Sequence, residues 1–172
     1  MLNSPWLDLS ASLWRRTVGS RLVDMVGRRA PYRMVPRKVT GLYVESLHRD
    51  LRGEWDFDLR WKPQQSFPAR AGWLRAIRRG HRRVQAGIDC GAPVLVLTPS
   101  RGSQPEQWCD DVTCTDLVLD PRQTTRWAPC LGSAVTIVQV DGALHDVVLS
   151  AKEQREQAYE AMARWLAAYL PK

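Results

Sequence analysis

The C-terminal half of the chain alternates strand-like and helix-like segments, and this order constrains the fold more than any other feature. Residues 92 to 98, APVLVLT, form a continuous apolar run between a glycine and a proline, as a strand buried on both faces does. Residues 134 to 140, AVTIVQV, are rich in β-branched side chains and predict a second strand. A helical segment follows each strand, which is the pattern of parallel strands joined by crossover helices. The predicted fold class is therefore α/β.

Both helices in this half carry start signals. Asp120, Pro121 and Gln123 fit the N-cap, the first and the third helical positions, so a helix is predicted after Asp120. Residues 150 to 153, SAKE, fit a capping box and predict a last helix that ends at Pro171. The apolar side chains of that helix recur at helical spacing: Tyr159, Met162, Ala163, Leu166, Tyr169 and Leu170.

The preceding region, residues 8 to 86, has many Trp, Arg, Pro and Gly residues and no long β-branched run, so it is predicted to be helical and rich in loops. Residues 73 to 85, WLRAIRRGHRRVQ, predict an amphipathic helix whose apolar stripe holds Trp73, Ile77, Gly80 and Val84, with Arg75, Arg78, Arg79, Arg82 and Arg83 on the other side. Residues 53 to 63, GEWDFDLRWKP, predict an extended segment or irregular loop. Its aromatic side chains, Trp55, Phe57 and Trp61, are expected to cover an apolar surface.

Composition narrows the classes of partner and cofactor. The formal net charge of +7 would suit an anionic partner, but no helix-turn-helix, zinc or RNA-binding motif is present, so nucleic acid is not expected. The four cysteines, Cys90, Cys109, Cys114 and Cys130, form no metal-binding spacing and predict reduced thiols, with a local Cys109–Cys114 disulfide as the lesser alternative. Neither a signal-like start nor a membrane-spanning run is present, so we expect a cytoplasmic protein, with peripheral membrane contact left open.

Acidic and histidine side chains follow the two predicted strands. The first loop holds Asp110, Asp111, Asp116 and Asp120, and the second holds His145. Because the carboxyl ends of parallel strands meet at one edge of a sheet, an acid and a histidine are expected in the same crevice. A buried carboxylate beside an imidazole is the acid–base part of a serine-nucleophile triad. A loop histidine near an aspartate is more often structural, so the residues alone leave both interpretations open.

Several strings resemble the α/β-hydrolase superfamily, specifically hydrolases of the lysophospholipase and monoacylglycerol-lipase type. TDLVLDP, residues 115 to 121, is similar to the acid loop of that family, and GALHDVVLS, residues 142 to 150, is similar to its histidine loop. The resemblance implies that Asp116 is the catalytic acid and His145 the general base. LNSPWLDL resembles the strand that leads into the lid, and YVESLH, GEWDFDLRWKP and GWLRAIRRGH resemble a lid. The implied division is the end of a core strand (residues 1–7), a lid (8–86) and a C-terminal core segment (87–172).

Two departures from the family pattern matter. The family often has an acidic residue soon after the strand that here ends at Thr98, so Asp110 and Asp111 remain alternative acids. The nucleophile motif Gly-x-Ser-x-Gly does not occur, and Ser20, Ser103 and Ser133 follow glycines without the rest of the motif. The resemblance thus implies part of a serine hydrolase that cleaves lipid-like carboxylic esters in the complete protein, inactive as this chain alone.

Two other functions remain open. The chain could be a non-catalytic interaction protein derived from a truncated hydrolase, with a partner or second copy bound through an exposed sheet edge. It could also be a basic anion-binding module, which would bind with steep salt dependence. No metal or organic cofactor is implied by any of the three.

Overall fold

The computed structural model describes residues 1–9, 13–36 and 39–170. In chain order the elements are β1 (Leu2–Asn3), α1 (Leu13–Arg29), α2 (Leu42–Leu47), α3 (Ala71–Gln85), β2 (Val94–Pro99), α4 (Pro121–Trp127), β3 (Val135–Val140) and α5 (Lys152–Tyr169). Short 3-10 helices cover Asp110–Thr113, Ala128–Leu131 and Val147–Leu149.

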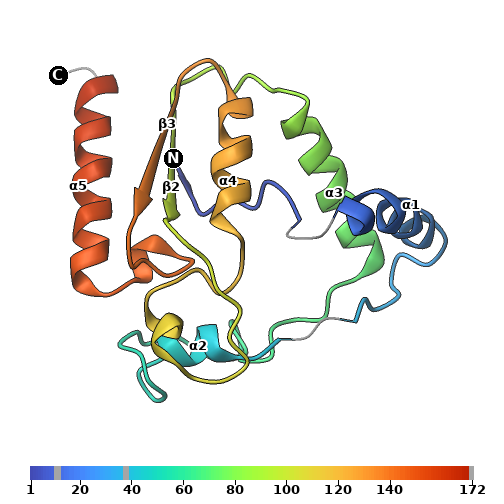
Figure 1. Cartoon of the computed structure of the whole chain (residues 1–172), viewed down its shortest axis with the longest axis horizontal. Helices are drawn as coiled ribbons and strands as arrows, with labels where there is room; N and C mark the ends of the chain where they lie inside the picture. The colour runs from blue at the N-terminus through green and yellow to red at the C-terminus, as the bar shows by residue number, and fades with distance from the viewer. Residues whose placement is uncertain (10–12, 37–38, 171–172) are drawn as a thin grey trace.

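The three strands form one parallel sheet in the order β1-β2-β3, which confirms the predicted α/β class. Val94 of β2 pairs with Val135 of β3, and α4 lies in the connection between these two strands. The middle strand, β2, is buried over its whole length, as its apolar run predicts. The outer edge of β1 pairs with no other strand in the described part of the chain. Figure 1 shows α5 on one side of the sheet and α4, with α3 beyond it, on the other.

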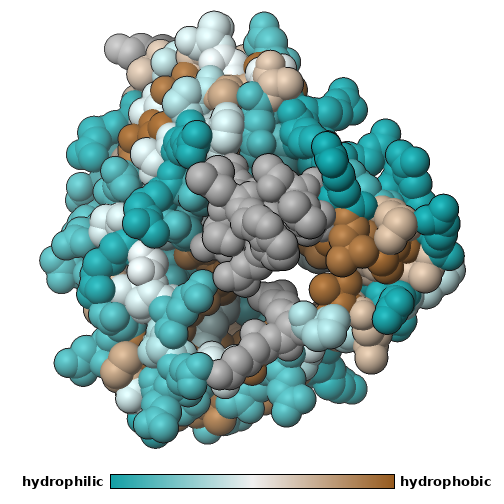
Figure 2. Space-filling view, turned by 45° about the vertical axis from the view of Figure 1, so that its right-hand side comes forward, coloured by the Kyte–Doolittle hydropathy of each residue, from teal (hydrophilic) through white to brown (hydrophobic). Residues whose placement is uncertain are grey.

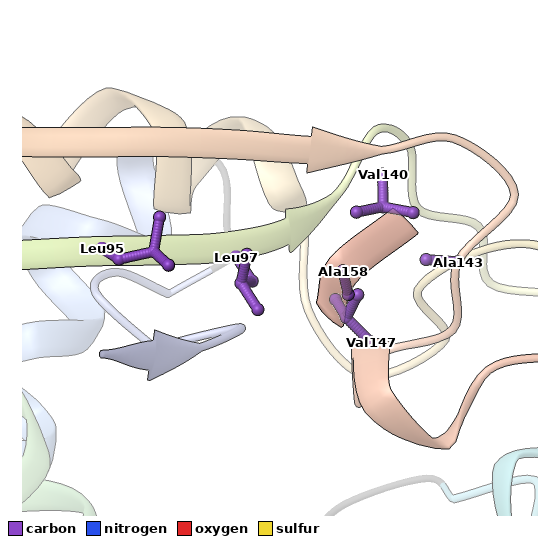
Figure 3. Packing of buried hydrophobic residues seen from close by; sticks show 6 residues of the cluster. All are labelled: Leu95, Leu97, Val140, Ala143, Val147 and Ala158. Atoms are coloured by element: carbon purple, nitrogen blue, oxygen red, sulfur yellow. The ribbon is translucent and has the colours of Figure 1, made fainter. Parts of the chain in front are cut away.

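Alternation along β2 divides the core into two layers, because successive side chains of a strand point to opposite faces. Leu95 and Leu97 pack toward α5, in a cluster that includes Val140, Val147 and Ala158 (Figure 3). On the opposite face, a second buried cluster contains Leu7, Val94, Val96, Ala128 and Leu131. Val84, near the end of α3, packs against this second cluster. The end of the predicted lid region therefore contributes to the core.

Truncating Leu97 is expected to lower the free energy of unfolding by about 3 kcal/mol, because Leu97→Ala leaves a cavity in a closed cluster. Leu97 is only 2% exposed, whereas Leu22 on α1 is 56% exposed and provides a matched control, Leu22→Ala. Chemical denaturation of both variants measures the difference. Equal losses of stability in the two variants would contradict the assignment of the core.

The helix predicted after Asp120 is confirmed, and the predicted capping box is wrong. The Asp120 carboxylate accepts a hydrogen bond from the amide of Arg122, and Pro121 occupies the first turn of α4. By contrast, α5 has Ala151 as its N-cap, without a side-chain cap. The Ser150 hydroxyl instead accepts a hydrogen bond of 2.9 Å from the amide of Leu144. The hydroxyl that would cap the helix is thus used within the loop before it.

The apolar face of α5 also differs from the prediction. Ala158 and Ala161 are buried, and Met162 and Trp165 pack against the cluster around Leu97. Three of the side chains assigned to the stripe, those of Tyr159, Tyr169 and Leu170, are exposed. Small alanines face the sheet because they allow the helix to approach it closely. Pro171, the predicted stop, lies outside the described residues.

The arginine-rich helix is present as α3, but its predicted faces are partly wrong. His81 is buried, whereas Trp73 is 48% exposed and Gly80 has open space where a Cβ would be. Arg75 and Arg78 are half-buried, and the other three arginines of the set are exposed. Arg82 forms an ion pair of 3.4 Å with Asp24 of α1. Figure 2 shows a hydrophobic patch on the side where these helices lie, within a mainly hydrophilic surface.

The remaining expectations concern loops, thiols and membrane spans. Residues 53 to 63 are irregular, as predicted, with Trp55 and Phe57 half-buried and Trp61 81% exposed. All four cysteines are free thiols, which agrees with the expected reduced state. No helix among the described residues is both long and apolar enough to cross a membrane.

Candidate active site

The loop between β2 and α4 buries the carboxylate of Asp116. Its backbone N–H donates to the carbonyl of Arg101 and its own carbonyl accepts from Ser103, so the acid loop is bonded to the chain just after β2. A Cβ at Gly102 would lie 2.9 Å from the carbonyl oxygen of Leu119, so this approach requires a glycine. Asp116 is consequently held in place and is 1% exposed.

Both carboxylate oxygens of Asp116 have hydrogen-bond donors. Oδ1 accepts from the amides of Val118 and Leu119, each at 2.8 Å. Oδ2 lies 2.9 Å from Nδ1 of His145. These N–H donors satisfy both oxygens of a carboxylate from which water is excluded.

The loop after β3 positions His145 through contacts with three other parts of the chain. Gly142, with a φ of 71°, turns the chain away from the strand. The hydroxyl of Ser150 accepts from the amide of Leu144, and the side-chain oxygen of Asn3 accepts from the amide of Val147. The hydroxyl of Tyr43 accepts from the amide of Asp146 at 3.1 Å. These contacts bind the loop on both sides of His145.

The two nitrogens of the His145 ring differ in their surroundings. Because a carboxylate only accepts hydrogen bonds, the contact with Asp116 places a proton on Nδ1 and leaves the lone pair of the neutral ring on Nε2. No side chain in the described part of the structure bonds to Nε2. The side chain is 23% exposed and lines a cavity. Asp116, which is buried, and His145, which is open to a cavity, are thus brought together.

The two alternative acids lie elsewhere. The Asp111 carboxylate binds the guanidinium of Arg101 at 2.8 Å, and Asp110 is exposed at the start of a 3-10 helix. Asp146, next to His145 in sequence, accepts a hydrogen bond from Nδ2 of Asn3. Among these aspartates, Asp116 is the one whose carboxylate contacts the imidazole.

The cavity beside His145 has a volume of about 710 Å³. Much of its wall comes from residues 39–67, which we call the wall segment. Figure 1 shows this part of the chain, with α2, at the carboxyl ends of the strands. The wall is mixed, with apolar side chains from Val44, Trp61, Phe67, Leu117 and Val118 and polar ones from Thr40, Lys62, Gln64 and Gln104. It could hold an organic molecule with an apolar part and a polar part.

Tyr43 lies at the site although no sequence pattern indicates it. Its ring packs edge-on against the His145 ring, with 5.8 Å between the centroids. Burial raises the pKa of its hydroxyl above the ordinary value, and the nearby charges of Asp146 and Asp116 act in the same direction. The hydroxyl therefore stays protonated and neutral. The string YVESLH contains this tyrosine, but no local pattern shows that it would contact the histidine loop.

Among the residues that the structure describes, no serine is placed to act as a nucleophile beside His145. The hydroxyl of Ser103 bonds to that of Thr115 at 2.7 Å, and Ser133 is an exposed residue before β3. Ser20 belongs to α1, and its side chain is not among those that the structure describes. No hydroxyl of a described serine is bonded to His145. Likewise, within the described residues, no three His, Cys, Asp or Glu side chains are clustered as a metal site requires.

The arrangement can supply a base but not an attacking group. An imidazole fixed by a buried carboxylate can take a proton from a hydroxyl and return it to a leaving group. For acyl transfer it needs a nucleophile and oxyanion donors on the open side of the cavity.

No known family profile matches the chain, and no curated protein matches it in sequence. A solved structure does match the fold, a soluble variant of monoglyceride lipase from Saccharomyces cerevisiae, crystallised in complex with a substrate analog. The TM-score is 0.61 at 11% sequence identity, over 98% of this chain. This chain spans about half, 55%, of the length of the lipase chain. At this identity the match establishes resemblance to an α/β-hydrolase at the level of the fold.

Proposed function

We propose that these residues supply the acid and the base of a serine-type ester hydrolase. His145 is the general base, Asp116 is the residue that orients it, and the cavity beside Nε2 holds the ester. The attacking serine and its oxyanion donors would come from polypeptide outside this 172-residue chain. The observation that carries the proposal is the contact of 2.9 Å between Asp116 and His145, with Nε2 left open to the cavity.

The proposed reaction is acyl transfer in two steps. Nε2 of His145 takes the serine proton as the serine oxygen attacks the ester carbonyl, and the imidazolium then gives that proton to the departing alcohol. In the second step His145 takes a proton from water as the water attacks the acyl-enzyme, and returns it to the serine oxygen as the carboxylic acid leaves. Throughout, the Asp116 carboxylate stabilises the imidazolium and keeps the ring in the required tautomer.

The mixed wall of the cavity favours a lipid-like ester as substrate. Trp61 and Phe67 are exposed at 81% and 62%, although both line the cavity. Exposed aromatic side chains at a cavity mouth can cover an acyl chain. Within the predicted lid, residues 8–86, the wall segment would be the part that contacts substrate.

On its own, the 172-residue chain is expected not to hydrolyse p-nitrophenyl butyrate faster than its His145→Ala variant. Loss of both the nucleophile and the oxyanion donors removes the groups that account for nearly all rate enhancement in such enzymes. Release of p-nitrophenolate measures the rate. Turnover together with fluorophosphonate labelling of Ser20, Ser103 or Ser133 would show that another serine serves as nucleophile.

The longer chain tests the function itself. The nucleotides upstream of Met1 are read in frame for a strand followed by Gly-x-Ser-x-Gly, and the encoded protein is expressed. We expect it to cleave the ester and to be labelled by the fluorophosphonate at the serine of that motif. An in-frame stop without this motif, in a chain that is stable as purified, would favour the non-catalytic interaction protein.

A further inference from the structure

Lys62 is an unusual member of the cavity wall because its cation is half-buried against aromatic rings. The ammonium lies 4.6 Å from the centroid of the Tyr43 ring and 5.8 Å from that of Phe57. A lysine in a loop can normally extend into water, where its charge is best solvated. Here the rings hold it at the wall of the cavity.

Among the residues that the structure describes, no carboxylate contacts the Lys62 ammonium directly. Within the described ranges, no Asp or Glu oxygen lies within ion-pair distance of the Lys62 ammonium. Burial lowers the pKa of Lys62, while the nearby charge of Asp146 raises it. Asp146 is itself bonded to Asn3, and Glu106, also on the wall, has an interaction of its own. A partly desolvated cation without a bonded anion is a group that an anionic ligand would stabilise.

Lys62 and His145 contact the same tyrosine ring. The Lys62 ammonium contacts the same Tyr43 ring that packs against His145 at 5.8 Å. Lys62 and His145 also line the same cavity, so one ester molecule held there can contact both. Lys62 is therefore placed to contact the alcohol part or the acyl end of the same molecule.

We propose that Lys62 is the anion-binding residue of this cavity and selects esters that also carry a phosphate or carboxylate group. The proposal rests on the proposed function for the identity of the ligand as a substrate. The wall segment then serves two purposes: Trp61 and Phe67 contact the apolar part, and Lys62 binds the charged part. A neutral glycerol ester would leave the ammonium without an ionic partner.

Binding to the 172-residue chain provides the first test. Isothermal titration compares hexanoyl glycerol 3-phosphate with hexanoyl glycerol, both as monomers, and hexanoyl lactate serves as the carboxylate arm. We expect the phosphate ester to bind more tightly than the neutral one, and Lys62→Met to weaken its binding about tenfold or more, the size of a lost charge-assisted contact. Binding of the neutral ester should not change. Inorganic phosphate alone shows whether the anion is bound without the ester.

Two further variants separate recognition from folding. Lys62→Arg keeps the cation and should retain most of the affinity for the phosphate ester. Lys152→Met removes the same charge from an exposed site on α5, where side-chain exposure is 77%, and should leave binding unchanged. Thermal unfolding of each variant checks the fold. Equal affinity of Lys62→Met and the parent chain for the phosphate ester would overturn the inference.

Hydrolysis by the longer chain distinguishes this inference from the proposed function. Cleavage of neutral and anionic esters with KM values that Lys62→Met does not alter would overturn the role of Lys62 and leave the hydrolase function intact. Lys62-dependent binding without cleavage of any ester would support the role of Lys62 and overturn the hydrolase function. If Lys62→Met raises KM for the anionic ester alone, with kcat little changed, both the role of Lys62 and the hydrolase function are supported.

Discussion

Replacing His145 with alanine is expected to reduce kcat for ester hydrolysis by about 10⁶-fold in a chain that also contains the serine nucleophile, the size of loss found when the base of such a triad is removed. The variant lacks the group that takes the serine proton and later protonates the leaving alcohol. It also leaves the Asp116 carboxylate buried without its imidazole partner. The measurement is the rate of p-nitrophenyl butyrate cleavage, with fluorophosphonate labelling as a second readout.

The control for this variant is chemical rescue. Truncation of His145 opens space beside Asp116 on the cavity side, so free imidazole can enter and take over the proton transfer. Partial recovery of rate on adding imidazole is expected, and a purely structural role for His145 would not produce it. A loss of less than tenfold in the untreated variant would rule out His145 as the base.

Replacing Asp116 with asparagine is expected to lower kcat by about 10⁴-fold, with little change in the fold. The amide oxygen can still accept from the amides of Val118 and Leu119. The amide nitrogen, however, is a donor, and facing Nδ1 it favours the tautomer with its proton on Nε2. That tautomer cannot accept the serine proton.

This tautomer change can be observed without the nucleophile. Nitrogen-15 NMR of the histidine side chains of the 172-residue chain should show protonated Nδ1 in the parent and protonated Nε2 in Asp116→Asn. The matched controls are Asp110→Asn and Asp111→Asn, because those carboxylates do not contact His145. Both controls should keep the parent tautomer, and in the longer chain that contains the nucleophile they should keep most of the activity. A loss of activity in Asp110→Asn or Asp111→Asn larger than that in Asp116→Asn would assign the acid role to the residue replaced.

The parts of the fold that the sequence predicts depend on short-range rules. The apolar run of β2 indicates burial on both faces, and the Asp120-Pro121 pair indicates where α4 begins, since each effect acts within a few residues. The carboxyl ends of β2 and β3 lie together in a parallel sheet. The neighbourhood of Asp116 and His145 follows from that topology.

The features that local rules miss depend on contacts that form only once the loops are placed. Ser150 lies in a sequence that fits a capping box, yet its hydroxyl is bonded to Leu144, and this could not be known before the histidine loop was placed. Tyr43 and Lys62 lie in a segment without helical or strand periodicity over most of its length. Their places on the cavity wall arise because the segment lies at the carboxyl ends of the strands, which no neighbouring residue specifies.

The wall segment and the histidine loop are joined by more than packing. Trp55 donates from Nε1 to the carbonyl of Leu149 at 2.7 Å, Tyr43 accepts from the amide of Asp146, and Glu54 pairs with Arg155 at the start of α5. The part that shapes the cavity thus also supports the loop that holds His145. Grafting this segment from a relative would displace His145 as well as change the cavity wall. Under the proposed function, substrate range and catalytic geometry would therefore have to diverge together in evolution.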